Sequence, residues 1–110
     1  MSILLSEQDG VLIVMPQGRL DTNNSPEAEQ LIVDKIEQDS TRIVYDFSKT
    51  DYISSAGLRV VLKSAKMVKG NGSVAICNAN EQIHEVFEIS GFLTILNYLP
   101  NLEDAIKSVS

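Results

Sequence analysis

The chain has 110 residues, 44% of them apolar and 22% charged, a composition typical of one globular domain rather than a disordered or fibrous protein. Its 15 acidic and 9 basic residues give a formal net charge of -6, which disfavours nucleic acid and membrane surfaces as partners. The one cysteine, Cys77, excludes an intrachain disulfide, and we expect it to pack as a small buried apolar residue. The first ten residues resemble neither a signal peptide nor a membrane span, so we predict a cytoplasmic, bacterial protein.

The amino-terminal region predicts a hairpin of two strands. The first strand, "SILLSEQ", ends at Asp9-Gly10, a dipeptide that favours a tight hairpin turn into "VLIVMPQG". Residues 11–15 are all apolar, which indicates a strand covered on both faces. Pro16 predicts that this strand is near its end or lies at an edge of the sheet. The polar stretch "GRLDTNNS" then reads as a loop, with a short extended piece at its Arg-Leu step.

The remainder predicts helices alternating with strands. A helix begins with Ser25 as its cap and Pro26 in its first turn. The strands "TRIVYDF" and "SVAIC" flank a helix over residues 55–69. After them the sequence predicts the helix "NEQIHEVFEIS", a short strand in "LTILNYL" and a final helix capped by Asn101. This order predicts a single α/β domain over residues 1–110, with a mixed sheet and helices packed against it.

Catalytic and metal sites are poorly supported by the sequence. Ser55 follows a predicted strand, but "ISSAG" has only half of the Gly-x-Ser-x-Gly pattern of a hydrolase nucleophile, and His84, the one histidine, lies inside a predicted helix. We therefore expect no enzyme and no bound cofactor, with a small hydrolase using Ser55 as a remote alternative. Asp21, Asp46 and Asp51 lie near strand ends without metal-ligand spacing, so we interpret them as solvated turn residues.

The segment "YISSAGL" leaves two interpretations of its serines. Ser54 or Ser55 can cap the following helix, since the first-turn amides lack helical partners. Alternatively, Ser55 carries a phosphate, which adds about -1.5 to -2 charges at the positive end of the helix. The small residues Ala56 and Gly57 would let a partner approach the bare turn, and repulsion from nearby Asp21 would add to the effect of a phosphate.

Four segments in a fixed order carry a resemblance to a known family: "GRLD", "IVYDFSKTDYISSAGLRVVL", "GNGSVAICNAN" and "VFEISGFLTIL". With them, nearly the whole chain resembles the STAS domain of bacterial anti-sigma factor antagonists and sulfate transporters. The resemblance implies a mixed sheet of four to five strands with packed helices. Because the chain lacks membrane spans, it is more similar to the free-standing antagonists than to the transporters.

The resemblance also implies a partner switch. The antagonist binds a serine-kinase anti-sigma factor, the kinase uses its own ATP and magnesium to phosphorylate a serine at a helix start, the complex dissociates, and a serine phosphatase reverses the change. The modified residue falls on Ser55, with Ser54, which stands where the family usually has Asp, as second candidate. The implied contact surface is Ser54, Ser55, Ala56, Gly57 and Leu58, with Asp21 beside it. A scaffold without the switch, or a small-ligand sensor, is the alternative within the same fold.

Overall fold

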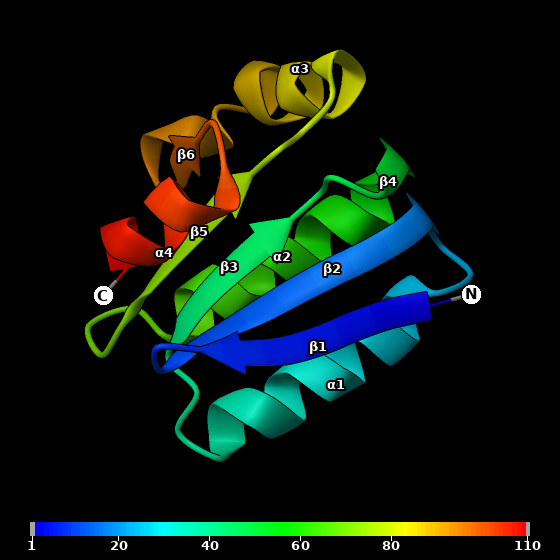
Figure 1. Cartoon of the computed structure of the whole chain (residues 1–110). Helices are drawn as coiled ribbons and strands as arrows, with labels where there is room; N and C mark the ends of the chain where they lie inside the picture. The colour runs from blue at the N-terminus through cyan, green and yellow to red at the C-terminus, as the bar shows by residue number, and fades with distance from the viewer. Residues whose placement is uncertain (1, 110) are drawn as a thin grey trace.

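The computed structural model describes residues 2–109, which form one mixed sheet with helices on both of its faces (Figure 1). In chain order the elements are β1 Ser2–Gln8, β2 Val11–Leu20, α1 Ser25–Glu37, β3 Arg42–Asp46, β4 Thr50–Ile53, α2 Ser55–Met67, β5 Ser73–Cys77, α3 Glu81–Ser90, a 3-10 turn Phe92–Thr94, β6 Asn97–Leu99 and α4 Leu102–Val109.

The sheet contains six strands in the order β1-β2-β3-β5-β6, with β4 paired to the second half of β2. The β1–β2 pair is antiparallel and every other pair is parallel. The expected α/β class and mixed sheet are therefore confirmed, while the strand number exceeds the four to five that the resemblance implied. The sequence predicts no strand between "TRIVYDF" and the helix that follows it, where the structure has β4.

The hairpin and the double coverage of β2 are confirmed. Asp9 and Gly10 both have positive φ, 56° and 78°, as a two-residue hairpin turn between twisted strands requires. Leu12 and Val14 are buried among residues of α1, α2 and α3, whereas Val11 and Ile13 are buried against α4. The unbroken apolar run thus fills two cores, one on each face of the sheet.

The prediction from Pro16 is wrong, because β2 continues for four residues beyond it to Leu20. β2 pairs with β3 up to Val14 and with β4 from Gly18 onward, so Pro16 lies in the interval between these two parallel pairings. The carbonyl oxygen of Pro16 accepts a 2.6 Å hydrogen bond from the hydroxyl of Thr50 on β4. A proline is tolerated there because neither parallel pairing extends to its position. The second half of β2 then continues beside β4 and ends at Leu20, next to the start of α2.

Helix caps are only partly as predicted. Asn101 caps α4, since its Oδ1 accepts from the Asp104 amide at 2.8 Å. Ser25 does not cap α1: it is the first helical residue, is 5% exposed, and its Oγ has no hydrogen-bond partner. The residue before it, Asn24, takes the N-cap position but directs its side chain into the preceding loop. Within the described chain, no helix is both long enough and apolar enough to cross a membrane.

Candidate functional site

The segment that links β4 to α2 presents one serine as a cap and the next as an exposed residue. Ser54 has extended backbone angles, φ -95° and ψ 175°, and its Oγ accepts from the Gly57 amide at 3.4 Å. Ser55 is the first residue of α2, and its side chain is exposed. Of the two capping candidates, Ser54 therefore caps the helix, and among residues 2–109 the hydroxyl of Ser55 makes no hydrogen bond.

Gly57 fixes the first turn of α2 against the end of β2. A Cβ atom at this position would lie 2.6 Å from the carbonyl oxygen of Leu20, and 2.8 Å and 2.9 Å from the side chains of Leu20 and Ile53. The same Leu20 oxygen accepts a 2.9 Å hydrogen bond from the Ser54 amide. Gly57 is buried, so its small size serves this internal contact, and of the small pair only Ala56 is partly exposed.

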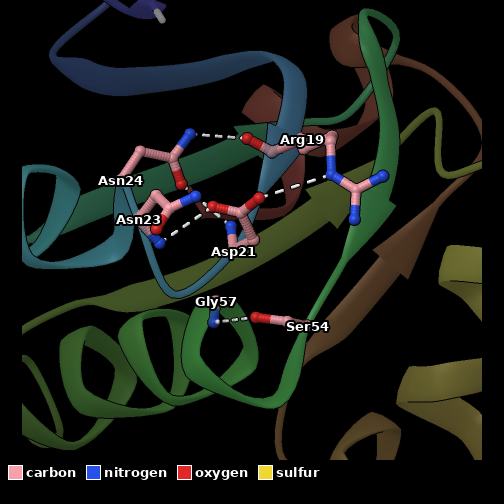
Figure 2. A network of polar contacts seen from close by, with 6 residues as sticks. All are labelled: Arg19, Asp21, Asn23, Asn24, Ser54 and Gly57. Atoms are coloured by element: carbon pink, nitrogen blue, oxygen red, sulfur yellow. Dashed lines mark hydrogen bonds and ion pairs between the residues drawn. The ribbon is translucent and has the colours of Figure 1, made fainter.

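The loop over residues 21–24 lies beside this turn and is held by its own polar network (Figure 2). Asp21 accepts from the Asn23 amide at 3.0 Å through Oδ1 and pairs with Arg19 Nε at 3.3 Å through Oδ2. Asn24 accepts from the Asp21 amide at 2.8 Å and donates to the Arg19 carbonyl at 2.6 Å. The network gives the carboxylate of Asp21 a defined place next to the start of α2 (Figure 2).

Arg19 and Tyr52 extend the site across the β2–β4 pairing. The two residues are register partners, and the guanidinium carbon of Arg19 lies 4.4 Å from the centre of the Tyr52 ring. A cation over an aromatic face is attractive, and here the cation also pairs with Asp21. Sequence analysis missed Arg19, Asn24 and Tyr52. The succession of Asp and two Asn residues, typical of turns closed by side chains, signals the loop network, but nothing in the sequence signals the Arg19–Tyr52 contact.

The start of α2 suits an anion. The first amides of a helix have no helical acceptors, and the helix dipole makes this end positive. Leu58 donates its amide to the Ser54 carbonyl at 2.9 Å and packs part of its side chain on the core, so the helix is regular from its first turn. The site residues expected from the sequence therefore lie together: Ser54, Ser55, Ala56, Gly57 and Leu58 form the turn, and Asp21 lies in the adjoining loop.

No catalytic arrangement forms around Ser55 within the described residues. His84 packs edge-on against the ring of Tyr98, with ring centres 4.6 Å apart, and shares no hydrogen bond with Ser55. Residues 2–109 hold no group of three or more acidic, histidine or cysteine side chains arranged for a metal ion. Asp51 is exposed, as expected, but lies in β4 rather than in a turn. The prediction of a solvated residue is wrong for Asp46, which is only 2% exposed. Two hydrogen bonds offset the cost of this burial, since Asp46 Oδ1 accepts from the Ser48 amide and from Asn78 Nδ2 and so closes the turn after β3.

Cys77 is buried and protonated, as predicted for a packing residue. Its side chain has no exposed surface and packs in the core between the sheet and α4. Burial, with a smaller contribution from the charge of Asp46, raises the pKa of the thiol to about 12. A thiol with this pKa is a poor nucleophile, so Cys77 contributes no chemistry to the site.

The comparisons with known proteins agree on one family. The model of the STAS domain matches residues 2–105 of the chain. A protein of Bordetella bronchiseptica that carries the provisional name anti-sigma factor antagonist BtrV is 40% identical over 96 residues, which cover 86% of this chain and 83% of the relative.

Two solved relatives share the fold. An anti-sigma factor antagonist from Mycobacterium paratuberculosis superimposes with a TM-score of 0.91 at 21% identity, covering 98% of this chain and 92% of its own. SpoIIAA, named as a Bacillus cell fate determinant, has been solved unphosphorylated and phosphorylated. The two forms match with TM-scores of 0.78 and 0.77 at 17% and 21% identity, each covering 97% of this chain and 96% and 98% of their own.

Proposed function

The chain belongs to the STAS domain family, and we propose that it is an anti-sigma factor antagonist. In this role it binds a serine-kinase anti-sigma factor through the start of α2 and releases it when Ser55 is phosphorylated. The name of the Bordetella bronchiseptica relative, which is 40% identical, supports the general role. The observation that carries the site is the exposed hydroxyl of Ser55 on the first turn of α2.

The geometry favours Ser55 over Ser54 as the modified residue. The Oγ of Ser54 is occupied by the cap contact to Gly57, and the residue is partly buried. A phosphate on Ser54 would replace the hydroxyl in that contact and disturb the helix start. Ser55 loses no contact on modification and is accessible to a kinase. Position 54 has Ser where the family usually has Asp, and the helix cap is retained because Ser and Asp are both good N-cap residues.

The switch follows from charge and shape. A phosphate adds about -1.5 to -2 charges and a bulky group beside the small side chains of Ser54 and Ala56. The loop network holds the carboxylate of Asp21 beside the same turn. A partner that binds the unmodified turn therefore accommodates the charge of Asp21, and after phosphorylation it would also have to accommodate the charge of the phosphate. Like charges brought together in an interface cost several kcal/mol, which is enough to separate the partners.

The antagonist itself performs no catalysis in this proposal. The phosphoryl group moves from the kinase's ATP to the Ser55 oxygen, which loses its proton, and ADP remains with the kinase. ATP and magnesium are therefore bound by the partner, and a serine phosphatase returns Ser55 to its free form.

Binding to the kinase captured from the source cell tests the proposal. Ser55→Asp should weaken binding about tenfold or more, whereas Ser55→Ala should retain it. Ser108→Asp is the matched control, since it adds the same charge to an exposed residue of α4 on the opposite face of the sheet. Equal binding by Ser55→Asp and Ser108→Asp would contradict the switch and favour a constitutive scaffold.

A further inference from the structure

The first turns of α1 and α2 border a common hollow next to Ser55. Its walls are Thr22, Ser25, Pro26 and Glu29 on one side and Ala56, Arg59 and Val60 on the other. Each helix is 13 residues long, and both begin at this hollow, so two positive helix ends meet there. The buried hydroxyl of Ser25, which has no hydrogen-bond partner, lies in the wall. An unused donor and two helix starts together point to an anionic ligand.

Arg59 is the cation placed to meet that ligand. It lies four residues after Ser55, hence on the same face of α2 and one turn along. Helical side chains lean towards the amino terminus of their helix, so the side chain of Arg59 can reach the first turn, and Arg59 lines the hollow together with Ala56 of that turn. Arg59 is exposed, and within residues 2–109 its guanidinium forms no hydrogen bond or ion pair.

The acidic residue among the walls of this hollow already has a cationic partner. Glu29 lies in the same walls, but its Oε2 accepts from Lys63 at 3.0 Å. The carboxylate of Asp21, in the loop before α1, pairs with Arg19. The hollow therefore leaves one guanidinium free, and the residue one turn before it is the proposed site of phosphorylation.

We propose that Arg59 binds the phosphate of phosphorylated Ser55 at the mouth of this hollow and so holds it against the start of α2. The inference rests on the proposed function, because it concerns the state that phosphorylation creates. The planar guanidinium donates two parallel hydrogen bonds to phosphate oxygens, and the free first-turn amides add further donors. The ion pair with Arg59 fixes the phosphate over the surface that a partner would contact. In the phosphorylated form the phosphate therefore has one position on the first turn of α2 and does not move freely in solvent.

The pKa of the phosphate tests this contact directly. Phosphoserine is incorporated at position 55 during translation, and the second ionisation of the phosphate is followed by phosphorus NMR. Because a neighbouring cation stabilises the dianion, Arg59→Gln should raise the pKa of the phosphate by about 0.5, the size expected for a partly exposed ion pair. Arg59→Lys should give a smaller rise, because it keeps the charge without the two-donor geometry.

Lys66→Gln is the matched control, since it removes the same charge from an exposed position further along α2. A rise in Arg59→Gln no larger than that in Lys66→Gln would overturn the assignment of Arg59. Failure of this inference is distinct from failure of the proposed function, because the phosphoserine is installed without a kinase. A kinase that leaves Ser55 unmodified contradicts only the proposed function.

Discussion

Gly57→Ala tests the contact on which the geometry of the site depends. The new Cβ would lie 2.6 Å from the Leu20 carbonyl oxygen and 2.8 Å from the Leu20 side chain, closer than such atoms approach in folded proteins. The carbonyl oxygen cannot simply move away, because it accepts the amide of Ser54 at 2.9 Å. The substitution must therefore push the end of β2 and the start of α2 apart.

The expected loss of stability is the difference between two opposing effects. Overpacking of this kind costs about 1–3 kcal/mol, whereas Gly to Ala within a helix gains about 0.5–1 kcal/mol. We expect Gly57→Ala to lower the free energy of unfolding by about 1–2 kcal/mol. For a domain of this size the corresponding fall in Tm is roughly 5–15 °C.

Urea unfolding followed by far-ultraviolet circular dichroism measures this change, with Ser55→Ala as control. Ser55 is exposed on the same turn, so its replacement should alter the free energy of unfolding by less than about 0.5 kcal/mol. A Gly57→Ala protein as stable as the wild type would refute the reasoning, because the first turn of α2 would then not be pressed against Leu20.

Two further predictions concern the cap and the buried thiol. Ser54→Ala removes the acceptor for the Gly57 amide and should lower the free energy of unfolding by about 1 kcal/mol in the same urea experiment, while Ser54→Asp should retain stability; equal loss in both would argue against a capping role. Because the pKa of Cys77 is raised to about 12 from its ordinary value of 9.0, the folded state keeps a proton that the unfolded state loses. The contribution of this thiol to stability is complete below pH 9 and is lost as the pH rises towards 12. Between pH 9 and 11 the free energy of unfolding should therefore fall less steeply with pH in Cys77→Ala than in the wild type. An equal pH dependence in the two proteins would contradict the assignment.

The parts of the fold that follow from local rules were predictable from the sequence. Asp9-Gly10 predicts the hairpin, and the continuous apolar residues at the start of β2 predict a strand that is buried on both faces of the sheet. β4 was not predictable, because its Thr50–Ile53 segment is short and follows polar residues, and it becomes a strand only through pairing with the far half of β2. The prediction from Pro16 failed for a related reason, because β2 can contain a proline only where its pairing with β3 has ended and its pairing with β4 has not yet begun.

The site was predictable in position but not in its internal division of roles. The pair Ser54-Ser55 offered two equivalent caps, and only the backbone angles distinguish the capping serine from the exposed one. Gly57 could be read as an opening for a partner, because the sequence does not reveal that the carbonyl of Leu20 lies against it. Arg19 and Tyr52 meet through the register of β2 and β4, which is a property of the assembled sheet.

Phosphoryl transfer to the purified protein tests the central claim most directly. The protein is incubated with ATP, magnesium and the serine kinase captured from its source cell, and its intact mass is recorded. The account predicts a gain of one phosphate in the wild type and in Ser54→Ala, and none in Ser55→Ala. A phosphate that persists in Ser55→Ala and disappears in Ser54→Ala would contradict the assignment of Ser55, and no transfer to the wild type would contradict the switch itself.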